Sequence, residues 1–386
     1  MTQWSPQQET ALKAVSDWLR AHKAGSAPQC FRVFGFAGTG KTTLARHLAQ
    51  GVDGDVLFGA YTGKAALVLR NKGCPNASTI HAMIYQTRDG PGGVPEFVLD
   101  HGSAAADAAL VIIDECSMVD EELGADLLSF GTPVLVLGDP AQLPPVKGGG
   151  FFTNHDPDVM LTEIHRQAAD NPIIALSQTV REGGRLQQGD YGSVRVIGRR
   201  QLNPNDIVEA DQLLCGKNAT RRNMNAWFRR VTGLANPLEQ VTPVVGDKLV
   251  CLKNNHGKGL LNGGLWDVAK LDETPLKGRR KTSDLATGGL VRMVVQSLDF
   301  GIEGQGAEVT VPRAFFLGTE SEMSWKERRR YDEFDFGYAL TVHKSQGSQW
   351  DNVMVFDESR VFRDEAHRHL YTAITRAAER LTIVQT

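Results

Sequence analysis

The chain has 386 residues, 41% of them hydrophobic and 23% charged, and its formal net charge at pH 7 is -3. This length suffices for two or three domains, and the composition is that of a soluble globular protein. No apolar run approaches the roughly 20 residues that a membrane-spanning helix needs. The first ten residues also lack the basic and apolar regions of a signal peptide, so we expect a cytoplasmic protein.

The five cysteines are odd in number, widely scattered and never in C-x-x-C spacing. This pattern argues against a disulfide framework and against a zinc site, so we expect reduced and mostly buried thiols. The small net charge does not indicate a nucleic-acid partner, although a local basic groove would be enough to bind one.

The first predicted helix covers residues 5–19. Ser5 is a suitable N-cap, Pro6 suits the first helical position, and apolar residues follow at helical spacing. The amides of Gln7 and Gln8 at its start each offer a donor and an acceptor, which suits the Hoogsteen edge of adenine. Because a glycine-rich loop follows this helix, we assign adenine recognition to Gln8.

A strand, a glycine-rich turn and a helix are predicted within residues 31–50. The strand is the apolar run 31–34, the helix is 43–50, and the turn between them matches G-x-x-x-x-G-K-[ST] at every position. In such a loop the glycines let N–H groups wrap a phosphate, the lysine reaches the β- and γ-phosphates, and the threonine ligates Mg²⁺. We therefore expect a nucleoside triphosphate with Mg²⁺, bound by Gly35, Gly38, Thr39, Gly40, Lys41, Thr42 and Thr43.

A second strand, at residues 55–61, leads into a hydroxyl, a glycine and a lysine at a helix start. Thr62 and Lys64 there predict a second anion site, for which a nucleic-acid phosphate is a good ligand. An ordinary capped helix with a solvated lysine is an equal alternative. Thr79 and His81 repeat the combination of a hydroxyl donor with an imidazole.

Residues 86–105 are rich in glycine and proline around a short apolar segment, which predicts a small hairpin projecting from its domain. Phe97 in this segment is either a wedge or, more simply, a half-buried aromatic residue of a strand.

Two continuous apolar runs, 109–114 and 134–138, predict strands that are buried on both faces of a parallel sheet. Asp114 ends the first run, where it can hold Mg²⁺ through water. Glu115 beside it can polarise the attacking water, which predicts hydrolysis and not only binding. Gln142 follows the second run, and its amide can sense the γ-phosphate.

The second half of the chain changes character twice. Residues 206–232 predict an apolar strand and a basic helix, whereas residues 246–330 predict short alternating strands in a β-barrel-like insertion. The insertion contains a polar loop at 272–284 that is either solvated or in contact with DNA. Arg166, which precedes all of these, is a lone arginine of the kind more often found at a surface.

Residues 335–350 supply a hydroxyl, an imidazole and an ammonium group within four positions, at Thr341, His343 and Lys344. These groups suit the phosphates of a single nucleic-acid strand. Arg376 lies on a predicted helix close to the end of the chain. An arginine from a second domain can neutralise a γ-phosphoryl group only when the two domains close.

Eight segments follow one another along the chain in this order: GFAGTGKTT, AYTGKAA, STIH, VIIDECSMVD, VLVLGDPAQLPPV, LTEIHRQ, ALTVHKSQGSQWD and YTAITRA. Together they resemble the motif series of superfamily 1 helicases, and most closely the superfamily 1B enzymes of the RecD/Pif1 branch, such as the small Dda-like and RecD2-like helicases. The resemblance implies an α/β fold with two RecA-like P-loop NTPase domains in tandem. It also implies a hairpin insertion in the first domain and an SH3-like β-barrel insertion in the second.

On this resemblance the first RecA-like domain (1A) comprises residues 1–85 and 106–165, and the hairpin insertion (1B) comprises 86–105. The second RecA-like domain (2A) comprises 166–243 and 331–386, and the SH3-like insertion (2B) comprises 244–330.

The activity that the resemblance implies is that of a monomeric, ATP-dependent DNA helicase of a bacterial or phage-infected cell. It would translocate 5′ to 3′ on single-stranded DNA and unwind duplex, with replication, repair or recombination proteins as partners. Catalysis would use Lys41, Glu115, Gln142, Arg166 and Arg376, and DNA would bind to Thr62, Lys64, Thr79, His81, Thr341, His343 and Lys344. The related motif often has a carboxylate where Gln349 stands.

Two alternatives stay open on the residues alone. One is a DNA-stimulated ATPase with 3′ to 5′ polarity, and the other is a P-loop phosphotransferase that does not act on DNA.

Overall fold

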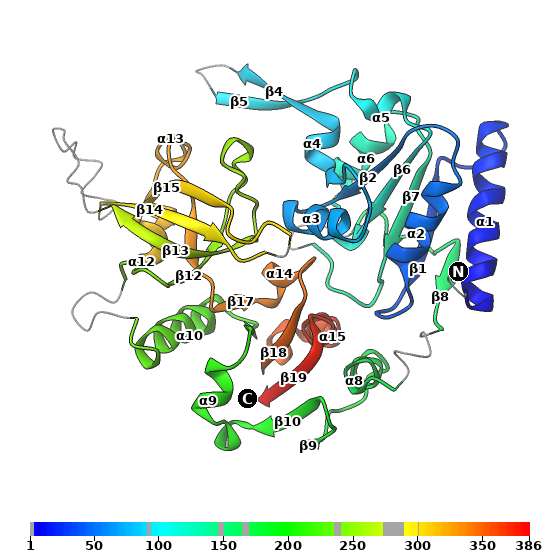
Figure 1. Ribbon diagram of the computed structural model, residues 1–386. Helices are drawn as coiled ribbons and strands as arrows, with labels where there is room; N and C mark the ends of the chain where they lie inside the picture. The colour runs from blue at the N-terminus through cyan, green and yellow to red at the C-terminus, as the bar shows by residue number, and fades with distance from the viewer. Residues whose placement is uncertain are drawn as a thin grey trace. The chain divides into compact units, whose positions relative to one another are not determined.

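The computed structural model describes residues 4–90, 94–145, 150–163, 170–234, 241–272, 289–299 and 301–386 (Figure 1). Arg166 and most of the polar loop predicted at 272–284 lie outside these residues. The chain divides into two compact units. The first unit contains residues 1–194, 347–349 and 362–376, and the second contains residues 195–346, 350–361 and 377–386.

The first unit is built on a parallel sheet with the strand order β3-β2-β6-β7-β1-β8. The strands are β1 (Cys30–Gly35), β2 (Val56–Ala60), β3 (Ser78–Thr79), β6 (Leu110–Asp114), β7 (Val134–Gly138) and β8 (Val159–Leu161). Most of their residues are buried, as the continuous apolar runs predicted, because the sheet is covered on both faces. The strands expected at 31–34, 55–61, 109–114 and 134–138 are thus confirmed.

Alternate residues of these strands belong to two separate cores. Val33 and Leu137 pack with α1 (Pro6–Lys23), α2 (Lys41–Gln50) and α3 (Gly63–Asn71). Phe34 and Val136 pack with α4 (Ile80–Ile84), α5 (Ala104–Asp107) and α6 (Glu121–Leu128) on the other face. The period of two along each strand therefore places helices on both sides of the sheet, visible in Figure 1.

The first helix begins as the sequence predicts. Ser5 is the N-cap of α1, Pro6 is its first residue, and Ser5 and Gln8 form a reciprocal capping box. The first unit also contains the short 3₁₀ helix η2 (Cys116–Met118), α8 (Pro172–Arg181), β9 (Gly189–Asp190) and α15 (Ala366–Ile374).

An antiparallel pair, β4 (Tyr85–Gly90) and β5 (Val94–Leu99), is present where the sequence predicts a small hairpin. Tyr85 lies opposite Leu99, and Phe97 lies opposite Thr87. The Phe97 side chain is 70% exposed, so it is not the half-buried strand aromatic that we named as the simpler alternative.

The second unit contains a sheet in which β17 (Ala339–Thr341), β11 (Gln212–Cys215), β18 (Trp350–Asp357), β19 (Ala377–Gln385) and β10 (Val194–Gly198) follow one another. The first four of these strands are parallel. Its helices include α9 (Pro204–Val208), α10 (Asn218–Val231) and α14 (Val342–Ser345). The 3₁₀ helices η3 (Arg199–Gln201) and η6 (Ser359–Glu365) connect strands and helices of this part of the chain. The strand and basic helix predicted within 206–232 are confirmed as β11 and α10.

A five-stranded antiparallel sheet with the order β15-β14-β13-β12-β16 occupies the region where short alternating strands were predicted. Its strands are β12 (Lys248–Cys251), β13 (Leu265–Asp272), β14 (Leu290–Ser297), β15 (Gly306–Pro312) and β16 (Phe334–Phe336), with η4 (His256–Lys258), α12 (Arg313–Leu317), η5 (Glu320–Glu322) and α13 (Trp325–Arg328) between them. Trp266, Phe334 and Val311 lie in its core.

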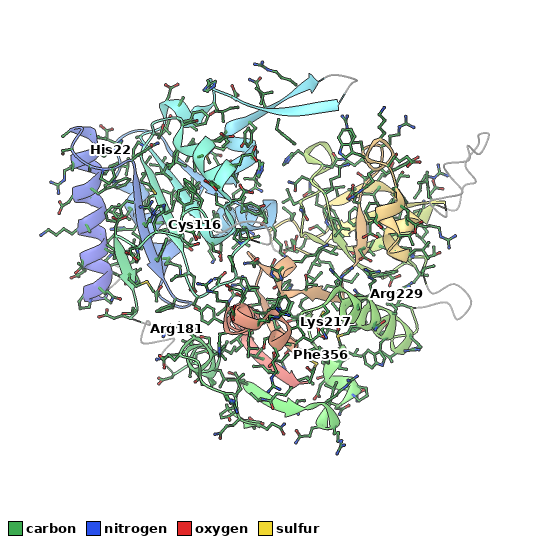
Figure 2. All side chains as sticks on the ribbon, turned by 180° about the vertical axis from the view of Figure 1, so that it is seen from behind. His22, Cys116, Arg181, Lys217, Arg229 and Phe356 are labelled. Atoms are coloured by element: carbon green, nitrogen blue, oxygen red, sulfur yellow. The ribbon has the colours of Figure 1, made fainter. Side chains whose placement is uncertain are left out.

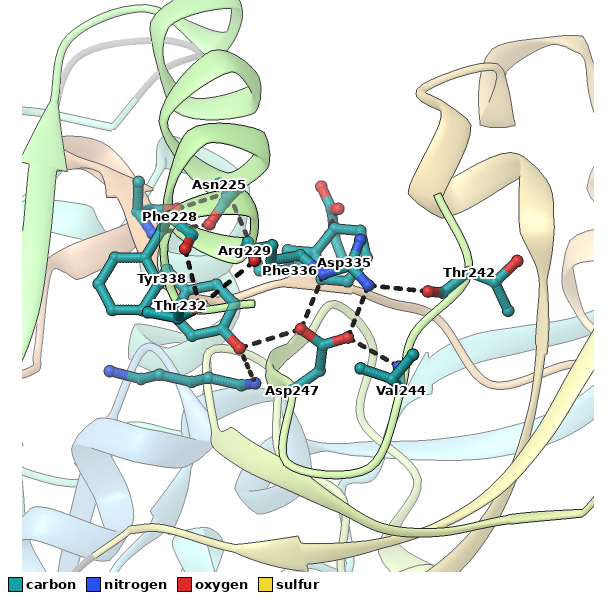
Figure 3. A network of polar contacts seen from close by, with 12 residues as sticks. Asn225, Phe228, Arg229, Thr232, Thr242, Val244, Asp247, Asp335, Phe336 and Tyr338 are labelled. Carbon is teal, nitrogen blue, oxygen red and sulfur yellow. Dashed lines mark hydrogen bonds and ion pairs between the residues drawn. The ribbon is translucent and has the colours of Figure 1, made fainter. Parts of the chain in front are cut away.

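A buried polar network connects α10 with the antiparallel sheet and with the segment before β17 (Figure 3). Arg229 and Asp247 are both fully buried and form a bidentate ion pair, with Nε to Oδ1 at 2.8 Å and Nη2 to Oδ2 at 2.9 Å. Tyr338 donates its hydroxyl to Asp247 Oδ1 at 2.9 Å, and Asn225 brackets Ala339 by donating to its carbonyl and accepting from its N–H. The network fixes the entry into β17 and α14.

Among the helices that the structure describes, none is both long enough and apolar enough to cross a membrane.

Candidate functional site

The glycine-rich turn lies between β1 and α2, as predicted. Gly38 and Gly40 have φ angles of 80° and 77°, in the left-handed region that favours glycine. Gly35 is required for a different reason, because a Cβ there would lie 2.7 Å from Thr39 Oγ1 and 2.8 Å from Leu161 Cβ. The loop conformation therefore depends on all three glycines.

Lys41 begins α2 and folds back over the loop. Its Nζ donates to the carbonyls of Gly35 at 2.6 Å and of Phe36 at 3.0 Å. The ammonium group thus lies within the loop whose N–H groups can wrap a phosphate.

Thr42 and Asp114 come together although 72 residues separate them. Thr42 Oγ1 donates to Asp114 Oδ2 at 2.8 Å, because α2 starts at the same edge of the sheet at which β6 ends. A hydroxyl and a carboxylate are the hard oxygen ligands that Mg²⁺ prefers, so this pair fits the ion that the sequence predicts.

Glu115 follows Asp114 in an unusual backbone conformation. Its φ is 53°, in the left-handed region, and its N–H donates to Asp114 Oδ1 at 2.9 Å. Burial raises the pKa of the Glu115 carboxyl, and the nearby Arg376 guanidinium opposes that rise. Strained, desolvated carboxyls of this kind cluster at catalytic sites, where they act as bases.

Gln142 lies in the turn that follows β7. Asp139 shapes this turn by accepting from Ala141 N–H at 3.0 Å through its carboxylate and from Gln142 N–H at 3.1 Å through its carbonyl. The Gln142 side chain is 7% exposed, and its Oε1 has no hydrogen-bond partner among the described residues. A buried amide oxygen without a donor is costly, and a water or a ligand hydroxyl would satisfy it.

Arg376 is buried and lies between α15, which ends at Ile374, and β19, which begins at Ala377, so the prediction that it lies on a helix is wrong. Its guanidinium donates to the carbonyls of Thr372 at 3.1 Å and of Ser348 at 3.2 Å, and to Thr375 Oγ1 at 3.1 Å. Arg376 and Glu115 are near enough to interact electrostatically, so the structure brings the predicted arginine to the predicted base. The second predicted arginine, Arg166, is outside the described residues.

Gln8 is 3% exposed and reaches the glycine-rich loop directly. Its Nε2 donates to Thr39 O at 3.0 Å, and its Oε1 accepts from Ser5 N–H at 3.1 Å. Gln7 points elsewhere, because its Oε1 accepts from the N–H groups of Thr162 and Glu163. Gln8 therefore supports the loop, and its recognition of adenine stays a prediction.

A cavity of about 530 Å³ lies beside the loop in the first unit. The guanidinium carbon of Arg181, at the end of α8 (Figure 2), lies 3.6 Å from the centroid of the Phe36 ring. None of the lining residues was singled out from the sequence as a site residue. The complete lining is Phe36, Pro140, Ala141, Arg181, Asp364, Glu365, His367, Arg368 and Tyr371.

The residues predicted to bind nucleic acid in the first unit lie at two helix starts. Thr62 caps α3 by accepting from Ala65 N–H, and Thr79 caps α4 by accepting from Ala82 N–H, each at 3.1 Å. Lys64 is only 7% exposed, so the alternative of a solvated lysine is wrong. The His81 ring lies between Tyr61 and Tyr85, with centroid distances of 6.2 Å and 5.7 Å.

The corresponding residues of the second unit lie at the start of α14. Thr341 is the N-cap and accepts from Lys344 N–H at 3.4 Å. Lys344 is exposed, and burial lowers the pKa of the half-buried His343. Gln349 is exposed, and the structure assigns no contact to its side chain.

A two-sided parallel sheet, a glycine-rich loop before α2, and a threonine paired with the aspartate of β6 together define a P-loop NTPase. Comparison with known proteins agrees, since an AAA domain model matches residues 5–198 and a UvrD-like helicase C-terminal domain model matches residues 336–384.

Curated relatives cover most of the chain. The ATP-dependent RecD2 DNA helicase of Deinococcus radiodurans is 31% identical over 90% of the chain, and protein R530 of Acanthamoeba polyphaga mimivirus is 32% identical over 91%. The matched region is 45% of the RecD2 relative, 32% of a probable conjugal transfer protein TraA of Sinorhizobium fredii, and 94% of R530. The chain therefore spans less than half the length of the RecD2 and TraA relatives.

Solved structures of Pif1 helicases have the same fold. Bacteroides Pif1 bound to single-stranded DNA matches with a TM-score of 0.58 at 18% identity, covering 99% of this chain and 92% of that one. Pif1 from Candida albicans matches with a TM-score of 0.55 at 20% identity, covering 100% and 95%. These structures agree in fold, and the sequence comparisons identify the family: the chain belongs to the superfamily 1B helicases of the RecD/Pif1 branch.

Proposed function

We propose that the protein is a Mg²⁺-dependent ATPase that translocates 5′ to 3′ on single-stranded DNA and unwinds duplex DNA. The observation that carries the ATPase part is the 2.8 Å contact between Thr42 and Asp114 beside the glycine-rich loop. The DNA part is supported by a relative that is named a DNA helicase and by a fold neighbour that is bound to single-stranded DNA.

In the proposed hydrolysis each residue has a separate task. Lys41 exchanges its loop carbonyls for the β- and γ-phosphates, and Gln8 holds the loop and reads the base. Glu115 accepts a proton from the attacking water, and Gln142 supplies the buried amide oxygen that orients it. Mg²⁺, held by Thr42 and Asp114, would neutralise charge on the phosphates. Arg376, together with Arg166, stabilises the charge that develops on the γ-phosphoryl group.

The proposed DNA contacts use groups at helix starts. In the first unit they are Thr62, Lys64, Thr79 and His81, and in the second they are Thr341, His343 and Lys344. Hydroxyls, N–H groups and cations at helix N-termini bind phosphates without selecting a base, as movement along a strand requires.

The domain scheme is part of the same proposal. Two RecA-like domains, 1A (1–85 and 106–165) and 2A (166–243 and 331–386), would carry a hairpin insertion 1B at 86–105 and an SH3-like insertion 2B at 244–330. The β4-β5 pair supplies strands for 1B, and β12, β13, β14 and β15 supply strands for 2B. The fifth strand of that antiparallel sheet, β16, lies in the range assigned to 2A.

The experiment that tests the function measures ATP hydrolysis with and without single-stranded DNA, for the wild type and for Glu115→Gln. We expect strong stimulation by DNA in the wild type and its loss in the variant. Duplexes with a 5′ or a 3′ single-stranded tail then test polarity, and only the 5′-tailed duplex should be unwound. Turnover that is indifferent to DNA would refute the helicase proposal and leave a P-loop phosphotransferase.

A further inference from the structure

Tyr371 connects two parts of the nucleotide site through one hydroxyl group. This residue of α15 is 1% exposed. Its hydroxyl donates to Asp139 Oδ2 at 2.7 Å and accepts from the N–H of Ala37 at 3.0 Å. Ala37 is a residue of the glycine-rich loop, 334 positions earlier in the chain.

The two partners of this hydroxyl have different tasks. Ala37 lies in the half of the loop that precedes Gly38, next to the carbonyls that hold the Lys41 ammonium. Asp139 shapes the turn that carries Gln142, because it accepts from the N–H groups of both Ala141 and Gln142. One hydroxyl therefore sets the distance between the phosphate loop and the turn with the buried amide.

The chemistry of the contact favours a fixed arrangement. A phenol has one donor and can accept at the same time, and here both capacities are used. The donor faces a carboxylate, and charge-assisted bonds are about twice as strong as neutral ones. Burial and the Asp139 charge raise the pKa of Tyr371, so the hydroxyl keeps its proton. The contact is thus preserved across the pH range in which proteins work.

The same helix leads to the arginine. Arg376 follows α15 and donates to the carbonyl of Thr372, the residue after Tyr371. We propose that Tyr371 is a positioning residue for ATP hydrolysis, whose hydroxyl aligns the phosphate loop with the Gln142 turn and with the helix that precedes Arg376. This proposal rests on the proposed function, and it concerns the rate of hydrolysis more than the affinity for nucleotide.

Tyr371→Phe removes the hydroxyl and keeps the buried ring. We expect kcat for DNA-stimulated hydrolysis to fall by roughly 10- to 100-fold, the effect of losing one charge-assisted bond from the transition-state geometry. The KM for ATP and the Kd for ADP should change by about twofold or less, because the loop glycines and Lys41 remain.

Tyr85 provides a matched control in the same unit. Its hydroxyl donates to Asp126 Oδ2 at 2.5 Å, so Tyr85→Phe removes the same atom from the same kind of pair. Tyr85 and Asp126 both lie outside the phosphate loop and the Gln142 turn, so kcat in the control variant should stay close to that of the wild type.

Two further measurements separate positioning from a merely structural role. Hydrogen exchange of a peptide covering residues 35–40 should quicken in Tyr371→Phe, because the Ala37 N–H loses its acceptor, and should not change in Tyr85→Phe. A double-mutant cycle with Asp139→Asn should show strong non-additivity in kcat, because both changes break the same bond.

The proposal is overturned if Tyr371→Phe leaves kcat and loop exchange unchanged. It is also overturned if Thr372→Val, which removes the neighbouring contact of α15 with Leu143 N–H at 3.0 Å, lowers kcat by the same factor, since the hydroxyl would then only help to dock the helix. A wild type without ATP turnover would refute the proposed function instead, and the exchange experiment would still decide whether Tyr371 holds the loop.

Discussion

The Thr42 hydroxyl donates to the Asp114 carboxylate at 2.8 Å, across 72 residues of sequence. Thr42 lies in the first turn of α2 and Asp114 is the last residue of β6. Replacing either residue therefore removes the hydrogen-bond partner of the other.

Replacement of either residue of this pair should strongly reduce Mg²⁺-dependent hydrolysis. We expect Thr42→Ala and Asp114→Asn each to lower kcat/KM by about 100-fold or more, because the charge stabilisation supplied by a metal ion is worth several kcal/mol. Thr42→Ser keeps the hydroxyl and should retain most of the activity. Chelation of Mg²⁺ by EDTA should reproduce the loss in the wild type, and turnover that persists in EDTA would contradict the assignment.

The buried Arg229–Asp247 pair should be important for the stability of the second unit. Asp247→Ala leaves a fully buried guanidinium without its carboxylate, which we expect to lower the free energy of unfolding by about 3–5 kcal/mol. Urea denaturation measures this change.

The partly exposed pair Arg195–Asp206, also in the second unit, is the control for that experiment. Asp206→Ala should cost about 1 kcal/mol or less, because solvent screens such pairs. Similar losses in the two variants would show that burial does not govern the energetics of the Arg229–Asp247 pair.

Phe97 should matter for unwinding and not for ATP turnover. Its side chain is 70% exposed on β5, so Phe97→Ala removes little buried area, and we expect the melting temperature to stay within about 2 °C of the wild type. If this hairpin meets the duplex junction, the unwinding rate of the variant falls while DNA-stimulated hydrolysis is unchanged. Phe97→Trp keeps an aromatic face for stacking and should restore unwinding. Equal unwinding by wild type and Phe97→Ala would exclude a wedge.

The thiols should be unreactive in the folded protein. All five cysteines are buried, and burial raises the pKa of Cys30 to about 11 and of Cys215 and Cys251 to about 12. At pH 8 only roughly one Cys30 thiol in a thousand is therefore ionised, and the thiolate is the reactive form. We expect a disulfide reagent such as DTNB to label no thiol quickly at pH 8, and to label all five in guanidinium chloride.

The same pKa shifts have a consequence for stability. A folded-state pKa above the ordinary value means that the unfolded chain loses protons first as the pH rises. The contribution of these thiols to stability is complete below their ordinary pKa of 9.0 and is lost as the pH rises toward 11 and 12. The urea midpoint should consequently fall between pH 9 and pH 11. A midpoint that is constant over this range would contradict burial of the thiols.

Local signals in the sequence predicted much of the fold. The apolar runs 109–114 and 134–138 became strands β6 and β7 because a continuous run has no face that tolerates water. The glycine-rich loop was equally predictable, since its geometry restricts which residues can stand at Gly38 and Gly40.

The contacts that complete the site were not predictable in this way. The bond between Tyr371 and Ala37 joins positions 334 apart, and no local periodicity encodes such a contact. The support that Gln8 gives to Thr39 O was missed for a related reason, because an amide suits a carbonyl as well as an adenine. The resemblance to helicase motifs predicted the site residues. Their hydrogen-bond partners could be identified only from the folded structure.

The position of Lys41 has a consequence for nucleotide affinity. Its ammonium group already donates hydrogen bonds to two carbonyls of its own loop. These carbonyl oxygens occupy the donors that would otherwise bind phosphate oxygens. Nucleotide binding is then an exchange of partners, in which the lysine leaves two neutral oxygens for charged ones. The measured affinity therefore reports only the difference in free energy between these two sets of bonds.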